Sequence, residues 1–266
     1  MNHPLIVIFM VFLSLSVVVH DAFSADQDEP LEISADESLE WHRNDLYFQA
    51  RKNVKVVQGD TTLRSRLLKA LYRDGADGGV DIFKIHAEGG VRIISADNQV
   101  FGEQAVYNVD KGYAVITGGD LKLVSDNQTV TARDKFEYWV NDGRLEAHGD
   151  AFATREGDQI KSDKIIAIFT EGKGGKRVLK QLEAIGNVVI TTPDEVLKGN
   201  RAIYKAETNI AEIKDDVVIV RGPNKLQGMR AEVNLNTNVS KIFGGTEGAG
   251  GRVSGVFFPG SEGKSN

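Results

Sequence analysis

Few side chains in this sequence are spaced for catalysis or for metal binding. Beyond residue 24 the histidines are His42, His86 and His148, and none lies in an HxH, HxxxH or HxxE arrangement that suits a metal ion. The chain has no cysteine, so its fold must be held by its core and its strand ladders alone. The sequence therefore predicts no cofactor and no metal site, and we expect the histidines at solvated surface positions.

Pairs of acidic residues and pairs of glycines could also suggest chemistry. Asp36-Glu37, Asp194-Glu195 and Asp215-Asp216 could act as general acid and base, but they lie beside predicted turns, where aspartate is favoured for backbone reasons. The glycine pairs, such as Gly89-Gly90 and Gly118-Gly119, lack the GxxxxGK[ST] pattern of a phosphate loop. We interpret both kinds of pair as turn residues, and the sequence predicts a protein that is not an enzyme.

The elements that would have to position such residues form a repeat. Asn187-Val188-Val189-Ile190 has counterparts that begin at residues 53, 90, 120, 150 and 216, so the starts are 29 to 37 residues apart. Each unit adds a second element of the type Leu197 to Tyr204 and a third of the type Leu182 to Gly186. Six units of two or three short strands predict an all-β fold of about 15–18 strands. Residues 64–73 have helical propensity, but they fall in register with the second element, so we predict a strand there.

Alternation within these strands assigns their side chains to two faces. Lys55, Arg92 and Lys122 share the middle position of the first element, so this position is predicted to face water. The flanking residues then share an apolar interior face that runs along the whole molecule. The third element adds Ile85, Val115, Leu145 and Leu182 in the equivalent inward register. The candidate binding residues on the interior face are Val54, Val56, Val91, Ile93, Leu121, Leu123, Val188, Ile190, Val217 and Ile219.

The two ends of the chain differ in composition from the repeats. Leu5 to Val19 is an apolar run, and Ala22 and Ser24 are small residues at the −3 and −1 positions of a cleavage site, so residues 1–24 are predicted to be a secretory signal peptide. Retention of the run as a membrane anchor is the alternative, although about 20 residues are needed to span a bilayer. We expect one β-domain over residues 25–259 and a disordered tail over residues 260–266. The net charge of −6 and the lack of a basic stripe exclude nucleic acid as a partner.

The repeated units read [GN]-[ND]-V-x-[IV], a polar turn, and then [LIV]-x-[SG]-[DN]-x-A-x-Y. This pattern resembles the OstA-like family of lipopolysaccharide transport proteins over roughly residues 31 to 243. The motifs that carry the resemblance are Ile33 to Asp36, Gly59-Asp60, Ile160 to Asp163, Gly186 to Ile190, Gly199 to Tyr204 and Gly228 to Ala231. The resemblance implies an open antiparallel β-jellyroll, shaped like a V, in which the acyl chains of lipid A slide along the apolar interior. It also implies a periplasmic protein that bridges the inner and outer membranes.

The partners that the resemblance implies are lipopolysaccharide, an LptC-like inner-membrane anchor and an LptD-like β-jellyroll domain of the outer membrane. An open sheet leaves a bare strand at each end, here near Ile33 to Trp41 and near Val253 to Phe258, and such edges accept a further strand. We expect these edges to bind the two partners and to allow head-to-tail self-association.

Three alternatives account for the same residues. The chain could be an LptC-like adaptor that stays anchored in the inner membrane through residues 5–19. It could also be a closed β-repeat protein that binds partners without lipid, in which case the apolar stripe is an ordinary core. A polysaccharide-degrading β-helix is the enzyme alternative, but the cluster of carboxylates that it requires does not recur in register.

Overall fold

The computed structural model describes residues 30–75, 78–172, 177–234, 236–237, 239–245 and 251–258. These residues form an 18-stranded antiparallel sheet and contain no helix, which confirms the all-β class. Accordingly, no helix in these ranges has the length and apolar character to cross a membrane. The predicted signal peptide, residues 1–24, and the predicted tail, residues 260–266, lie outside the described residues.

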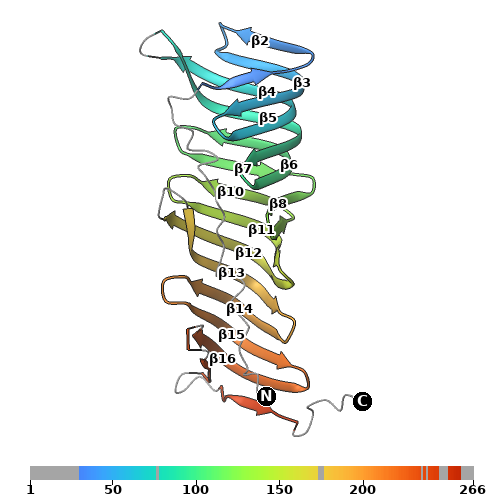
Figure 1. The fold of residues 1–266 in the computed structure, drawn as a ribbon, viewed down its shortest axis with the longest axis vertical. Helices are drawn as coiled ribbons and strands as arrows, with labels where there is room; N and C mark the ends of the chain where they lie inside the picture. Colours follow the sequence, from blue (N-terminus) through green and yellow to red (C-terminus); the bar gives the residue numbers. More distant parts are fainter. Residues whose placement is uncertain are drawn as a thin grey trace.

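The strands follow one another along the long axis of the molecule in chain order (Figure 1). Each strand pairs antiparallel with its neighbours in the stack. The segment with helical propensity, residues 64–73, lies in a strand, as its register predicted. The strands are β1 (Glu32–Ser34), β2 (Ser38–His42), β3 (Tyr47–Gln58), β4 (Thr61–Asp74), β5 (Val80–Ser95), β6 (Asn98–Asn108), β7 (Tyr113–Thr117), β8 (Leu121–Ser125), β9 (Gln128–Ala132), β10 (Lys135–Trp139), β11 (Arg144–Arg155), β12 (Asp158–Glu171), β13 (Arg177–Thr191), β14 (Val196–Lys205), β15 (Ile210–Arg221), β16 (Asn224–Asn234), β17 (Val239–Phe243) and β18 (Ser254–Val256).

Several strands are much longer than the sequence predicted, because each crosses the molecule through a bend. β13 has 15 residues and contains both the third element and the following first element of the repeat, which we had expected as separate strands. The bend lies at Gly186-Asn187, where both residues have positive φ and the pairing with β14 shifts register. Glycine adopts this backbone at little cost and asparagine tolerates it, and a bulge bends the strand that carries it.

The same bend recurs in every unit of the repeat. The [GN]-[ND] positions of the motif are thus pairs of residues in the left-handed region of the backbone, rather than residues of hairpin turns. Our interpretation of the glycine and aspartate pairs as turns is therefore wrong for Gly89-Gly90 and Asp215-Asp216, which lie within β5 and β15, whereas Gly118-Gly119 connects β7 with β8. The six pairs are Lys52-Asn53, Gly89-Gly90, Gly118-Gly119, Gly149-Asp150, Gly186-Asn187 and Asp215-Asp216.

The bends divide the sheet into two layers. β6 shows the division, because its second half pairs with β7 and its first half with β8. We call layer A the part that contains β2, β7, β10 and β17, and layer B the part that contains β1, β8, β9 and β18; the other ten strands contribute to both. Inward-facing side chains of both layers form one hydrophobic cluster from Ala50 to Val233. The core is therefore continuous along the stack.

Side-chain volumes at the bends are complementary from one strand to the next. A Cβ atom on Gly199 would lie 2.5 Å from Cγ2 of Ile213 on the next strand, so only glycine fits at this position. The same relation holds for Gly102 with Ile116 and for Gly228 with Ile242. Where the motif has serine, at Ser65 and Ser162, an alanine takes the place of the isoleucine, and the serine hydroxyl donates to a carbonyl two residues further along. This packing explains the [SG] alternative in the sequence motif.

Candidate functional site

The ten candidate binding residues all lie in the interior, on the layer B side of the bends. Each of them is less than a tenth exposed, and each belongs to the single hydrophobic cluster. Their exposed fractions are 1% for Val54, 6% for Val56, 2% for Val91, 4% for Ile93, 2% for Leu121, 8% for Leu123, 1% for Val188, 2% for Ile190, 1% for Val217 and 8% for Ile219. The structure therefore brings these residues together as one buried apolar surface.

The opposite face carries the charges that the alternation predicted. Lys55, Arg92 and Lys122 are exposed. One inward assignment of the third element is wrong, because Val115 faces outward while its neighbours Ala114 and Ile116 are buried. Val115 pairs with Glu137, an outward residue of β10, so it is equivalent to the glutamates and not to the leucines of the other units. A valine at this outward position is what shifted the assignment by one residue.

A row of polar side chains lines the interior beside the hairpin turns of layer B. Inward-facing positions nearest the bend are mainly apolar, but the inward position nearest the turn is polar in every unit of layer B from β3 to β16. Eight of these twelve side chains are buried. We call the set the polar row: Gln58, Thr61, Ser95, Asn98, Ser125, Gln128, Arg155, Asp158, Thr192, Glu195, Arg221 and Asn224.

Two carboxyl groups of the polar row are buried without a hydrogen-bond partner on one oxygen. Asp158 is 3% exposed and its Oδ2 has no partner, and Glu195 is 5% exposed and its Oε1 has none, among the residues that the structure describes. Burial raises the pKa of Asp158. Burial also raises the pKa of Glu195 to about 7, although Arg221 opposes this shift. Near neutral pH the Glu195 carboxyl is therefore partly protonated and can donate as well as accept a hydrogen bond.

The interior beside the turns of layer A is aromatic instead. Tyr72 is 4% exposed and accepts a hydrogen bond from Nε1 of Trp41 at 2.8 Å. Tyr204 is 2% exposed and donates to Oδ1 of Asn209 at 2.7 Å. The side chains at this edge are Phe48, Tyr72, Tyr107, Tyr138, Phe169 and Tyr204. The two edges of the interior thus differ in chemistry, since one is polar and the other is aromatic.

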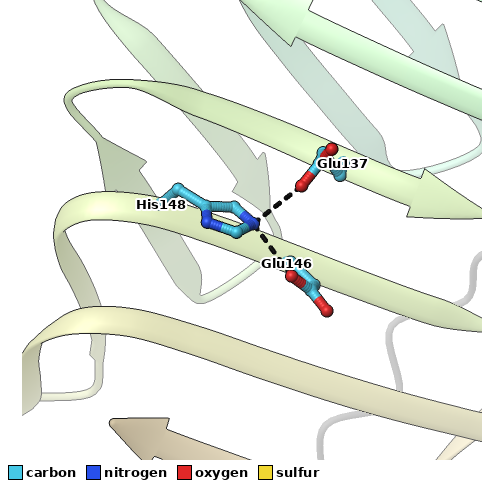
Figure 2. Close-up of side chains that lie close together, drawn as sticks. All are labelled: Glu137, Glu146 and His148. Atoms are coloured by element: carbon cyan, nitrogen blue, oxygen red, sulfur yellow. Dashed lines mark ion pairs between the residues drawn. The ribbon is translucent and has the colours of Figure 1, made fainter. Parts of the chain in front are cut away.

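An ion-pair cluster lies on the outer face of layer A (Figure 2). Nε2 of His148 is 2.8 Å from one carboxylate oxygen of Glu137 and 2.8 Å from one of Glu146, so the solvated position expected for this histidine is wrong. Glu146 is 2% exposed and also forms ion pairs with Arg144 and Lys164. These three groups are close enough to bind a metal ion, but the cations around Glu146 already neutralise its charge. The cluster therefore stabilises the sheet as an ion-pair network.

The other two histidines also lie outside the core. His42 stacks on Tyr47 with ring centroids 4.2 Å apart, and its Nε2 is 2.9 Å from Glu40. His86 is partly buried, and burial together with nearby Lys84 lowers its pKa. Neither belongs to the cluster around His148 among the described residues.

The two ends of the stack present unpaired strand edges. Among the described residues β1 and β2 pair only with β3, and β17 and β18 pair only with β16. Large apolar side chains are exposed at both ends, including Trp41 at 49% and Phe258 at 54%. The N-terminal edge lies near the predicted segment Ile33 to Trp41, whereas at the C-terminal end only β18 lies in the predicted segment Val253 to Phe258 and β17 was not expected.

The polar row is the feature that sequence reasoning missed. The signal was present, because the row continues the same alternation two residues beyond the apolar stripe, as in Val188, Ile190 and Thr192. Polar residues beside a predicted turn were interpreted as turn residues in contact with water. The structure instead buries Glu195, which was assigned to the turn after Pro193, because its side chain points inward like that of Leu197.

Comparison with known proteins relates part of this fold to a family. Residues 129–239 match the model of the LptA/(LptD N-terminal domain) LPS transport protein family. No curated protein sequence is similar enough to give a match. This segment runs from β9 to the start of β17 and contains the bends at Gly149-Asp150, Gly186-Asn187 and Asp215-Asp216.

Two solved structures are similar to the chain to different extents. One is LptH, the LptA-homologous periplasmic component of the lipopolysaccharide transport device of Pseudomonas aeruginosa, with 17% identity, a TM-score of 0.41, and coverage of 50% of this chain and 95% of LptH. The other is apo AztD from Citrobacter koseri, with 8% identity, a TM-score of 0.11, and coverage of 86% of this chain and 98% of AztD. Over residues 129–239 the chain is therefore similar to the LptA/LptD N-terminal domain family of LPS transport proteins, in agreement with the OstA-like repeat and with the non-enzymatic role that this resemblance implies.

Proposed function

We propose that the protein carries lipopolysaccharide across the periplasm, with the acyl chains of lipid A held between layers A and B. One observation carries the proposal: a single apolar cluster runs through the stack from Ala50 to Val233. A discrete binding pocket would need apolar residues in only one or two units. A surface along which acyl chains slide needs them in every unit, as this chain has.

Binding of an acyl chain requires the two layers to separate, because their inward side chains are buried against one another. The backbone ladders run within each layer, and the chain joins the layers at the bends. Separation would therefore exchange apolar side-chain contacts for apolar contacts with the lipid, without breaking a strand ladder. The free energy of such an exchange is small compared with that of exposing the same surface to water.

The strand edges supply the means of joining several copies or partners into a bridge. Strands in a sheet lie about 4.8 Å apart, so fourteen strand segments per layer extend over roughly 60 Å, and a longer path needs further domains. The single-sided pairing of β1 and β2 at one end, and of β17 and β18 at the other, leaves main-chain groups for strand addition. We infer that LptC-like and LptD-like β-domains, or a second copy of this chain, dock there.

Site-specific photo-crosslinking in cells tests the proposal. A photoreactive residue at Val91, Leu121 or Ile190 should capture lipopolysaccharide, because these positions are 2% exposed and face the interior. The control positions are Lys122, which follows Leu121 on β8, and Lys55 on β3. Both face outward and should capture none. Equal labelling of both faces would contradict the proposal.

Burial of the interior also favours a second candidate, the closed β-repeat protein that binds partners without lipid. The two candidates differ in the crosslinking result, since a closed core captures no lipid at any position. The anchored adaptor differs from the bridge only in its N-terminus. N-terminal sequencing of the exported protein should give a start at Ala25, and an intact Met1 would favour the anchor.

A further inference from the structure

The polar row places hydrogen-bonding groups at one edge of an interior that is otherwise apolar. It extends from β3 to β16, whereas the aromatic edge of layer A offers only tyrosine hydroxyls. Buried polar groups cost free energy unless they are hydrogen-bonded, so a row of them along an apolar core requires an explanation. Several members of the row are hydrogen-bonded within the chain, as Thr61 is to Ser95. The unpartnered oxygens of Asp158 and Glu195, on side chains 3% and 5% exposed, indicate that these two positions are suited to partners that the chain itself does not supply.

The charges of the polar row balance. Arg155 and Arg221 carry positive charge, Asp158 and Glu195 are acidic, and the remaining members are neutral amides and hydroxyls. Phosphate-binding sites concentrate arginine and lysine, and the two carboxyl groups of this row would repel a phosphate. Neutral groups with carbonyl and hydroxyl oxygens, in contrast, can exchange hydrogen bonds with every member of the row.

The position of the row relative to the apolar stripe defines how a lipid would lie. Val188 adjoins the bend, and Thr192 lies four residues further along the chain. Since a strand advances about 3.3 Å per residue, the row lies about 13 Å from the bend. An acyl chain that points toward the bend would place its carbonyl end at this height. The aromatic edge of layer A would contact only methylene groups there.

We propose that the polar row binds the uncharged linkage groups of the lipid, the ester and amide carbonyls and hydroxyls at the head ends of the acyl chains, and thereby fixes the head group at the layer B edge. This inference rests on the proposed function, which supplies the acyl chains in the interior. Because the row has polar side chains in every unit, a lipid that slides along the stack meets hydrogen-bonding partners at each step. The row thus sets the orientation of the lipid without holding it at one place.

Two double variants of the full-length exported protein separate hydrogen bonding from charge. Asp158→Leu/Glu195→Met removes the two polar groups, and Asp158→Asn/Glu195→Gln keeps them but removes the acidity. Each carboxyl group has one oxygen without a hydrogen-bond partner, and a thermal melt of each variant checks that the fold is retained. Tyr72→Phe, at the aromatic edge, is the matched control.

The measurement is displacement of diphenylhexatriene, a purely apolar fluorophore that reports binding in the interior, by diphosphoryl or dephosphorylated lipid A. All variants should bind the fluorophore as the unaltered protein does. The apolar double variant should need about tenfold more of either lipid for displacement, from the loss of two hydrogen bonds. The amide double variant and Tyr72→Phe should stay within about twofold of the unaltered protein.

Three results would overturn the inference while leaving the proposed function intact. They are unchanged displacement in the apolar double variant, a loss restricted to diphosphoryl lipid A, and an equal loss in the amide double variant. The second would indicate phosphate recognition, and the third would indicate a role for the carboxylate charge. Failure of the unaltered protein to bind either the fluorophore or lipid A would overturn both the inference and the proposed function.

Discussion

The bend at Gly186-Asn187 gives a quantitative test of how the sequence motif specifies the two layers. Gly186 has a φ of +76°, where alanine costs about 1–2 kcal/mol more than glycine. A Cβ atom at this position would also lie 2.8 Å from Cγ and 3.0 Å from Cβ of Asp163 on the neighbouring strand. Asp163 must therefore move if Gly186 is replaced by alanine.

Movement of Asp163 has a cost of its own. Its carboxylate accepts two hydrogen bonds from Nδ2 of Asn187, at 3.1 and 3.0 Å, and their loss costs about 1 kcal/mol because the site is exposed. With the backbone cost, Gly186→Ala should lower the free energy of unfolding by about 2–4 kcal/mol. Gly222→Ala is the matched control, because Gly222 has a φ of +51° and no atom within 4 Å of the new Cβ. It should cost only the backbone contribution of about 1–2 kcal/mol.

Urea denaturation followed by circular dichroism measures both variants. The double variant Gly186→Ala/Asp163→Ala removes the colliding carboxylate, so it should be no less stable than Gly186→Ala alone, in contrast to the additive loss expected for independent sites. Equal destabilisation by Gly186→Ala and Gly222→Ala would refute the reasoning, because it would show that the contact between the bend and Asp163 contributes nothing.

Four further predictions concern the core, the polar row, the ion-pair cluster and the strand edge. Leu197→Ala removes a fully buried side chain and should cost about 2–5 kcal/mol, whereas the exposed neighbour Lys198→Ala should stay within about 0.5 kcal/mol in the same denaturation assay. Burial raises the pKa of Glu195 to about 7 from 4.5, so the folded state binds this proton more tightly than the unfolded state. The contribution of Glu195 to the free energy of unfolding should therefore rise by about 1–3 kcal/mol as pH falls from 7 to 4.5. Glu195→Gln should remove that part of the pH dependence. Glu146 is 2% exposed, and Glu146→Gln leaves Arg144 and Lys164 without their counter-charge. The variant should lower the free energy of unfolding by about 3 kcal/mol, and an unchanged thermal melt would contradict the ion-pair network. Phe258→Asp, at a side chain 54% exposed beside β18, should weaken self-association in sedimentation velocity without changing the thermal melt.

Much of the fold could be predicted because the repeat carries a strong period of two. Val188, Ile190 and Leu197 face the interior as their alternation indicated, and an apolar stripe in register over six units fixes strand, face and order together. The all-β class and the two terminal edges follow from the same pattern. The register also assigned residues 64–73 to a strand against their helical propensity, since tertiary pairing outweighs local preference in a sheet.

The parts that could not be predicted depend on contacts between distant strands. The Gly-Asn and Asp-Asp pairs are sequences typical of turns, and only the pairing with the next strand distinguishes a bend within a strand from a turn between two strands. Val115 was assigned inward on its apolar character, although its cross-strand partner Glu137 places it outward. His148 was expected in water because the glutamates beside it are 11 and 2 residues away in sequence, and the sheet places both within 2.8 Å.

The central claim is tested most directly by measuring whether the interior of the purified protein contains lipid. The full-length protein would be produced and exported in cells that make lipopolysaccharide and purified without detergent. Its mass would then be measured by native mass spectrometry. The proposed function predicts a population heavier than the bare chain by the mass of one or more lipopolysaccharide molecules, and this population should disappear after extraction with organic solvent. A protein that carries no lipid under these conditions, although it is folded and its strand edges self-associate, would contradict the claim and would favour the closed β-repeat protein.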